Sequence, residues 1–407
     1  MRRRSRLALL AAVVGPGLLA GLSDDDPAGI TTYSMLGAEH GYALLWVLAL
    51  STVALILFHE LGARLGIVTG QGLAGLIRER YGIRVAAGAV FALVIANVGT
   101  TCAEFAGVAA AFELAGVSRY LSVPVAAVLV STLVLGGRFH RVEHVLLVLA
   151  TAFATYIVAG VLAGPDWGAA AEGLVVPTLP GDRDGLLLVT ATIGTTLAPW
   201  GLSFIQSYAV DKRLTPSDLT YERIDVITGA VMTGVIGAFI VLACAATLHA
   251  TGTSIKDAGD AATALQPLAG DSASLLFGAG LLGAALLAAS ILPLSTAYAV
   301  GEVLGYEAGL DDSFNEARTF YCTYGAIVVV AAAAVLIPGA PLVSILFLTQ
   351  ALNAVLLPPL LILMARMARD PDLMGRQRSG RVAAVAYGVT IVVLIVCVAA
   401  LAVLAVG

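Results

Sequence analysis

The feature that most constrains this chain is a nearly unbroken succession of apolar segments long enough to cross a lipid bilayer. A spanning helix needs about 20 mostly apolar residues. Eleven such segments lie at about residues 7–36, 41–66, 83–115, 121–137, 143–164, 185–210, 225–250, 272–302, 318–337, 341–367 and 381–406. Only 12% of the 407 residues are charged, so no stretch is left for a water-soluble catalytic domain. We therefore predict an all-α polytopic membrane protein with eleven spans.

The basic residues predict the orientation of these spans. With the N-terminus in the cytoplasm, 18 of the 22 Lys and Arg residues lie in cytoplasmic segments, 3 lie outside, and Arg64 lies near an inner helix end. This distribution follows the positive-inside rule. We therefore predict a cell (plasma) membrane protein with a cytoplasmic N-terminus and an extracellular C-terminus. The basic residues form no patch that could bind nucleic acid.

A long loop divides the chain into two halves. It contains Pro165, Pro177 and Pro180 and separates five spans from the next five. Because five is odd, the two halves have opposite orientations, as inverted repeats require. We predict a first repeat at residues 1–164, an extracellular connecting loop at 165–184, a second repeat at 185–367, and a cytoplasmic loop with span 11 at 368–407.

The first span of each half is interrupted at a matching place. Span 1 contains Asp26-Pro27-Ala28-Gly29 and span 6 contains Ala198-Pro199-Trp200-Gly201. Proline removes a helical hydrogen bond and clashes with the preceding turn. Unwound backbone inside a membrane survives only where it is buried in protein or lines a cavity. Paired broken helices indicate a transporter binding site, where freed carbonyl groups coordinate ions.

Three aspartates, Asp24, Asp25 and Asp26, stand beside the first break. Each acidic residue at the middle of a spanning helix costs about 2.5–3.5 kcal/mol on insertion scales. The three carboxylates therefore face water or a cation, or lie at a helix end where solvent reaches them. A negative charge also suits the N-terminus of the second half-helix. Asp26, next to the proline, is the strongest candidate for a cation ligand.

These motifs resemble the natural resistance-associated macrophage protein (NRAMP) family of divalent-metal transporters. The resemblance covers essentially the whole chain and implies the LeuT-type fold: two inverted five-helix repeats plus an eleventh helix, with spans 1 and 6 broken around a cation site. The residues that carry it are Gly15-Pro16-Gly17, Asp26-Pro27-Ala28-Gly29, Gly41-Tyr42 with Leu44-Leu45-Trp46, the run from Ala63 to Gly70, Ala103-Glu104-Phe105 with Gly107, and Gln350.

The chain departs from the family pattern at the implied site. Gly29 stands where typical members have a metal-binding Asn, and Ala198 stands where they have a metal-binding Met. Three further positions that the family associates with its proton path also differ, and here they hold Trp200, Ile205 and Thr101. The family's glutamate remains, as Glu104. Such replacements distinguish the NRAMP-related magnesium transporters from typical members of the family. The chain therefore resembles this magnesium branch.

The remaining donors are all oxygen atoms. They are the Asp26 carboxylate, backbone carbonyls such as those of Ala28 and Leu197, and the Gln350 amide as a further candidate. Oxygen ligands suit magnesium, calcium and manganese, and the small residues Gly29 and Ala198 predict a wider cavity. Magnesium commonly keeps several of its waters. We expect a carrier of partly hydrated Mg²⁺, with Mn²⁺ as a further candidate, that works by alternating access without proton coupling.

Several other residues are assigned supporting roles. The expected vestibule or second layer around the ion comprises Asp24, Asp25, Trp200, Glu104, Thr101 and Asn353. Glu60 and Arg64, one turn apart on span 2, form a candidate gate pair, and Glu302 near the inner end of span 8 is a further gate candidate. The expected partners are the divalent metal ion and the lipid bilayer. We expect no cofactor beyond the transported Mg²⁺ or Mn²⁺ and no obligate protein partner.

Two alternatives stay open, and a third interpretation is rejected. The first is a proton-coupled Mn²⁺/Fe²⁺ importer of the NRAMP type. The second is a LeuT-fold transporter of a small organic solute, with Trp200 lining its pocket. The third is an intramembrane metalloprotease, suggested by His59-Glu60-Leu61-Gly62-Ala63. The HExxH zinc motif needs a second histidine, and Ala63 occupies that position, so we expect no enzyme.

Overall fold

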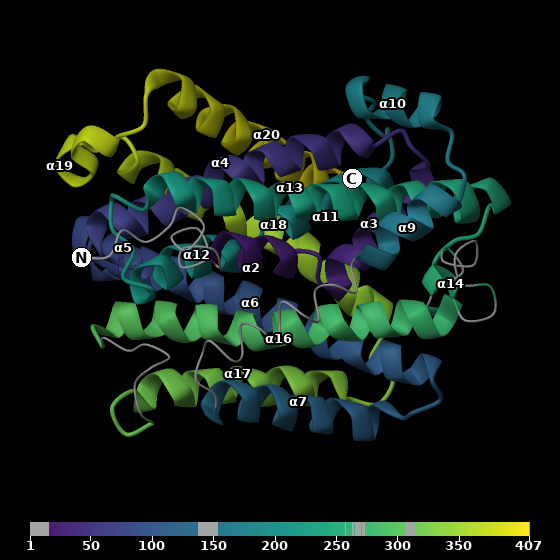
Figure 1. Ribbon diagram of the computed structural model, residues 1–407, viewed down its shortest axis with the longest axis horizontal. Helices are drawn as coiled ribbons and strands as arrows, with labels where there is room; N and C mark the ends of the chain where they lie inside the picture. Colours follow the sequence, from purple (N-terminus) through teal and green to yellow (C-terminus); the bar gives the residue numbers. More distant parts are fainter. Residues whose placement is uncertain are drawn as a thin grey trace, which may run out of the picture.

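The computed structural model describes residues 16–136, 154–256, 258–262, 264, 270, 273–306 and 314–406. All regular elements in these ranges are helices, and most run along the long axis of the molecule (Figure 1). Among the described residues, eight helices are long and apolar enough to cross a membrane, when the two parts of span 6 count as one. A ninth apolar helix, Arg119–Val134, is shorter.

The helices reproduce the predicted order of spans. In chain order they are α2 (Pro16–Ser23), α3 (Pro27–His40), α4 (Leu45–Thr69), α5 (Leu73–Tyr81), α6 (Ile83–Leu114), α7 (Arg119–Gly136), α9 (Ala154–Leu162), α10 (Trp167–Val175), α11 (Arg183–Thr196), α12 (Pro199–Asp211), α13 (Leu219–Cys244), η2 (Ala245–His249), α14 (Ala258–Ala262), α16 (Ala273–Leu304), α17 (Arg318–Val335), α18 (Leu342–Met367), α19 (Pro371–Met374), η5 (Gly375–Gln377) and α20 (Arg381–Val406). The start of span 1 near residue 7, Gly15 of the family motif, and most of span 5 before α9 lie outside the described residues.

Several helix boundaries differ from the apolar segments. For example, α13 begins at Leu219, before the predicted residue 225. Hydropathy marks the part of a helix that suits lipid, whereas backbone hydrogen bonds continue into polar residues beyond it. Within the described residues, the connections also contain four short α-helices, α5, α10, α14 and α19, that hydropathy does not predict.

The long loop between the halves is fastened to the start of α4. Its α10 packs against α4. Trp46 Nε1 donates to the Thr178 carbonyl oxygen at 3.0 Å, and Thr178 Oγ1 donates to the Ala43 carbonyl oxygen at 2.8 Å. The predicted connecting loop is therefore an ordered cap on one end of the bundle, which we name the α10 end after the helix labelled there in Figure 1.

The broken helices occupy the middle of the bundle. α2 and α12 lie toward the end that holds α5, here named the α5 end, and α3 and α11 lie toward the α10 end (Figure 1). α13 and α4 pack along them, and α6 and α16 pack against each other below them, with α17 and α7 beyond (Figure 1). α18 contacts α3, α6 and α11, so the breaks are enclosed by helices from both halves.

Glycines let α13 approach the broken first span closely. A Cβ built on Gly21 would lie 2.5 Å from the backbone carbonyl carbon of Gly229, so neither position has room for a side chain. Gly17 N donates to Asp225 Oδ2 at 2.7 Å, and Thr233 Oγ1 donates to the Gly21 carbonyl oxygen. Small residues spaced by four are typical of such close helix contacts in membranes. The α2–α13 contact therefore fixes the first half of the broken span.

This contact predicts a stability difference between two glycine variants. Gly229→Ala should lower the thermal unfolding midpoint of the detergent-solubilised protein, because overpacking a close contact costs about 1–3 kcal/mol. Gly325→Ala on α17 is the matched control, since a Cβ there meets no heavy atom within 4 Å. The control should keep or raise the midpoint, because alanine favours the helix. Equal midpoints for the two variants would contradict the close contact.

Candidate functional site

The two breaks interrupt their helices as the sequence predicts. α2 ends at Ser23 and α3 begins at Pro27, while α11 ends at Thr196 and α12 begins at Pro199. Neither proline has an N–H group to donate to the preceding turn. The segments 24–26 and 197–198 therefore carry the non-helical backbone, and helix ends with unpaired carbonyl and N–H groups converge beside them.

Hydrogen bonds and close packing join the two broken spans. The Tyr33 hydroxyl lies 2.9 Å from Thr196 Oγ1, and α3 packs against α11. The second broken span also packs against α18 at Gly194, which has no room for a Cβ beside the Gln350 carbonyl oxygen. On the other side, Gly107 of α6 has no room for a Cβ beside Pro27. The breaks are therefore held by direct contacts with α6 and α18.

Asp26 caps the second half of span 1. Its backbone is extended, and its Oδ1 accepts a hydrogen bond of 2.5 Å from Gly29 N. The Glu104 carboxyl group on α6 lies within electrostatic range of the Asp26 carboxyl group. Both side chains are buried, Glu104 completely. Two adjacent buried carboxyl groups need a proton or a cation between them.

Asp24 and Asp25 are buried with all four carboxylate oxygens lacking a hydrogen-bond partner. Asp24 Oδ1 lies near Gly201 of α12, and the Tyr33 hydroxyl group lies within electrostatic range of all three aspartates. In the part of the chain that the structure describes, no three His, Cys, Asp or Glu side chains converge in a metal-binding cluster. The three aspartates thus lie near enough to affect one another electrostatically without forming such a cluster.

Gly29 and Ala198 are the two positions at which the sequence predicts a wider cavity. A Cβ built on Gly29 would lie 2.7 Å from the Asp24 carbonyl oxygen and 3.2 Å from Thr195 Oγ1. The space expected beside Gly29 is therefore filled by the folded-back segment of the first break, and this expectation is wrong for the structure described. Ala198 is the N-cap residue of α12, and Leu197 and Ala198 are both buried, as is Ala28.

The polar residues of α18 bond mainly to one another and to α6. Asn353 Nδ2 donates to Gln350 Oε1 at 2.9 Å and to Thr100 Oγ1 at 3.1 Å. Gln350 Nε2 is buried without a partner, and Thr101 Oγ1 donates to the Asn97 carbonyl oxygen at 2.6 Å. The Gln350 amide oxygen therefore already accepts a hydrogen bond, and Asn353 faces α6.

Trp200 is a packed residue of α12. It is 1% exposed, and its ring centroid lies 6.3 Å from that of Phe204. Its backbone carbonyl accepts a hydrogen bond of 2.9 Å from Ser295 Oγ on α16. Ile205 one turn later is also fully buried. Neither position supplies a side chain that can exchange a proton near neutral pH.

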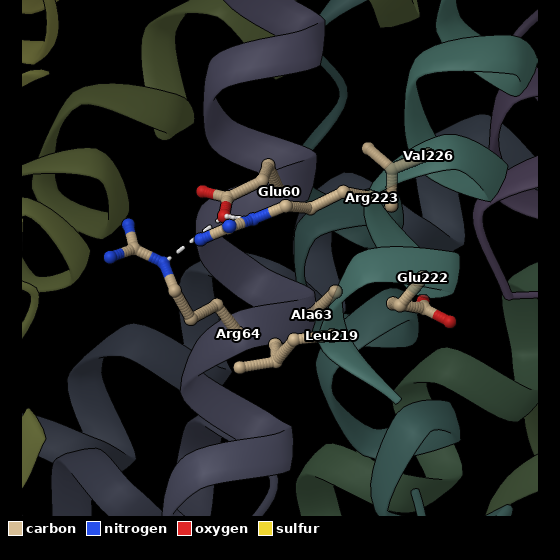
Figure 2. A pocket seen from close by; sticks show the side chains of 7 residues that line it. All are labelled: Glu60, Ala63, Arg64, Leu219, Glu222, Arg223 and Val226. Atoms are coloured by element: carbon tan, nitrogen blue, oxygen red, sulfur yellow. Dashed lines mark hydrogen bonds and ion pairs between the residues drawn. The ribbon is translucent and has the colours of Figure 1, made fainter. Parts of the chain in front are cut away.

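The predicted Glu60–Arg64 pair is present and is part of a larger network at the α5 end. Glu60 Oε1 lies 3.2 Å from Arg64 Nε and 2.8 Å from Arg223 Nε of α13, so it stands between two guanidinium groups (Figure 2). Arg64 also donates to the Gln377 carbonyl oxygen and to the hydroxyl groups of Ser379 and Tyr387. The network ties α4 to α13 and to the last helix.

Glu302 closes the same end in a different way. Its carboxylate accepts hydrogen bonds from Ala74 N at 3.0 Å, Gly75 N at 3.2 Å and Ser207 Oγ at 2.6 Å. It therefore caps the N-terminus of α5 and joins α5, α12 and α16.

Sequence reasoning missed three residues near the site or the gate. Thr195 faces Gly29, Arg223 shares Glu60, and His59 of α4 lies beside Gly201 with both ring nitrogens unpartnered. Each of these contacts joins segments that are far apart in the sequence, so no local motif predicts it. The unmatched histidine of the incomplete HExxH motif was the one available signal.

The site as a whole is rich in buried carboxyl groups. Those of Asp24 and Asp25 have no hydrogen-bond partner, and that of Glu104 lies beside the Asp26 carboxyl group. An uncompensated buried carboxylate costs several kcal/mol, and the adjoining C-terminal end of α2 adds further negative potential. Such an arrangement is stabilised by a cation, and it repels an anion.

Comparisons with known proteins agree with this geometry. The sequence model of the family described as "Natural resistance-associated macrophage protein-like" (Nramp) matches residues 17–404. A divalent metal cation transporter MntH of Burkholderia ambifaria is 31% identical over 92% of this chain and 84% of its own length. Divalent metal cation transporter MntH 1 of Pseudomonas aeruginosa is 36% identical over 69% of this chain and 67% of its own length.

A solved structure shares the fold. The crystal structure of the Eremococcus coleocola manganese transporter, in complex with an aromatic bis-isothiourea substituted compound, superposes with a TM-score of 0.78 at 19% sequence identity. The match covers 98% of this chain and 87% of that one. The predicted LeuT-type fold is thereby confirmed. Because the family model spans nearly all of the sequence, the chain belongs to the Nramp family of multi-pass membrane transporters.

Proposed function

We propose that this protein carries divalent metal cations across the cell membrane by alternating access, with the ion bound at Asp26 between the two helix breaks. The observation that carries the proposal is the set of buried carboxylates without partners around the first break. The MntH relatives are named divalent metal cation transporters, which agrees with this chemistry. The division into repeats and the cytoplasmic position of the N-terminus stay predictions.

The transported metal is the finer question. The comparisons favour the alternative of a manganese-type importer over the magnesium interpretation, since the relatives reported above include a manganese transporter and no magnesium transporter. The crowding at Gly29 also argues against extra room for a hydrated ion. One specific observation favours magnesium: Ala198 offers no thioether sulfur as a metal ligand at the second break. We therefore propose a transition-metal preference, with magnesium as the second candidate.

Alternating access requires that one end of the bundle open while the other stays shut. The site residues Asp24, Asp25 and Glu104 are at most 1% exposed, so the described conformation is closed around the ion position. The Glu60 network and the Glu302 cap hold the α5 end together. We propose that these contacts break when the site opens toward that end. The small organic solute alternative fits less well, because Trp200 is packed against Phe204.

Asp26 can be tested with a variant that separates charge from folding. Asp26→Asn keeps an oxygen that can accept the Gly29 N–H but removes the negative charge. We expect Mn²⁺ uptake into proteoliposomes to fall about 100-fold or more, equivalent to about 3 kcal/mol, with an unchanged unfolding midpoint. Asp182→Asn is the matched control, because Asp182 caps α11 through Gly185 N with the same spacing. Normal uptake by Asp26→Asn would mean that the site is misplaced.

Metal preference and coupling can be measured together in one preparation. Vesicles that hold the protein receive Mn²⁺ at a fixed inside-negative potential, with and without a large excess of Mg²⁺, while an interior dye reports pH. We expect Mn²⁺ entry that excess Mg²⁺ does not suppress. The potential supplies about 2.3 kcal/mol per charge per 100 mV, so a dication can enter without a proton. Because positions 200 and 205 hold Trp and Ile, we expect no acidification.

The other outcomes identify the alternatives. Mg²⁺ entry that suppresses Mn²⁺ uptake would restore the magnesium interpretation. Mn²⁺ entry with acidification would establish a proton-coupled importer and would move the proton-carrying role to another group, with Glu104 beside Asp26 as the first candidate.

A further inference from the structure

His59 is a buried histidine without a partner. It lies on α4 with 0% of its surface exposed, and neither Nδ1 nor Nε2 has a hydrogen-bond partner. A buried polar group that makes no hydrogen bond costs free energy, and each such group in a native structure calls for an explanation. The incomplete protease motif does not supply one. Both ring nitrogens are therefore available to a ligand.

The imidazole and the Asp24 carboxylate both lie close to Gly201. A Cβ built on Gly201 would lie 3.0 Å from His59 Nε2 and 3.6 Å from Asp24 Oδ1. Both side chains are buried, and no hydrogen bond joins them. His59 lies on α4, Gly201 lies in the first turn of α12, and these two helices pack against each other. Because Gly201 carries no side chain, a nitrogen donor and an oxygen donor both approach its backbone.

We infer that Asp24 and His59 form a second cation station beside Asp26, where a transition-metal dication binds to the imidazole nitrogen and a carboxylate oxygen. This inference rests on the proposed function and narrows it to a metal class. Asp24 stands two residues from Asp26, and the two carboxyl groups lie within electrostatic range of each other. Asp24 also lies near Gly201 and His59, whereas Asp26 lies beside Glu104. An ion can therefore occupy the station as a step on its way to or from Asp26.

The donor set decides the class of metal. An imidazole nitrogen suits iron, nickel, copper and zinc, whereas magnesium prefers oxygen and water. Affinity at a nitrogen-containing site rises from manganese through iron and cobalt to nickel. In the described part of the chain no third acidic, histidine or cysteine side chain joins the pair. Two side-chain donors hold a metal ion less firmly than a full set of ligands does, which suits a station that must release the ion again.

Pulsed electron paramagnetic resonance of bound Mn²⁺ gives a direct test. The detergent-solubilised full-length protein, loaded with Mn²⁺ alone, should show nitrogen modulation from a coordinated imidazole. His59→Gln should lose this modulation, because the amide side chain has no ring nitrogen. His249→Gln is the matched control: His249 is exposed, and its Nδ1 lies 3.0 Å from the Ala38 carbonyl oxygen. That variant should keep the modulation.

Transport gives a second readout that a merely structural histidine would not move. In proteoliposomes, His59→Gln should lower Co²⁺ uptake relative to Mg²⁺ uptake by about 10-fold, the lower end of the losses seen when metal-site partners are removed. The loss should be larger for Co²⁺ than for Mn²⁺, because cobalt gains more from nitrogen. An equal loss for all ions would indicate a packing defect and overturn the inference.

Gly201→Ala tests the station without removing either donor. Its added methyl group would lie 3.0 Å from His59 Nε2 and 3.6 Å from Asp24 Oδ1. It should therefore block the imidazole nitrogen, so the nitrogen modulation should disappear while both side chains remain. This variant decides the matter if His59→Gln does not fold. Persistent modulation in Gly201→Ala would overturn the inference.

The same measurements keep the two proposals apart. Wild-type protein that neither binds nor transports a divalent metal would contradict the proposed function. Wild-type protein that transports Mn²⁺ through Asp26 but shows no nitrogen modulation would leave that function standing and overturn only the station.

Discussion

The structure depends on burying carboxylates where two helices are broken. Asp24, Asp25 and Asp26 occupy the gap between α2 and α3, and only Asp26 makes a hydrogen bond, to Gly29 N. A continuous helix could not expose its carbonyl groups there, and a break without charge would have little attraction for an ion. Pro27 and Pro199 supply the breaks, and the acidic residues supply the field. Each feature alone destabilises the protein, and a bound dication offsets the free-energy cost of both.

Such a costly centre requires a surrounding structure that cannot relax around it. The α2–α13 contact at Gly21 and Gly229 brings backbones together, and Gly107 does the same for α6 against Pro27. Because these contacts have no room for a side chain, the broken segments cannot shift sideways to reach solvent. The flexible part of the protein is then expected at the helix ends, where Glu60 and Glu302 make polar contacts that can be exchanged for water.

The span order and both breaks could be predicted from the sequence, because hydropathy and proline act locally along the chain. The surroundings of Gly29 could not, since the Asp24 carbonyl that crowds it is placed by the folded-back break. The surroundings of His59 could not be predicted either, because Asp24 and Gly201 near it come from distant segments of the chain. The family resemblance predicts Asp26 as a metal ligand, but it directs attention to the donors absent at positions 29 and 198. A donor on a different helix lies outside the motifs on which that resemblance rests.

An imidazole donor changes the argument about metal choice. With Asp26, backbone carbonyls and Gln350 alone, every ligand is an oxygen atom, and the site would have little means to prefer a transition metal over abundant magnesium. The Gln350 amide is a weak candidate for a metal ligand, because its oxygen already accepts a hydrogen bond from Asn353 Nδ2. Placing one imidazole beside Asp24 adds discrimination before the ion reaches Asp26. Selectivity would then lie in the route to the oxygen site, and the loss of a thioether at Ala198 would not by itself make the protein a magnesium carrier.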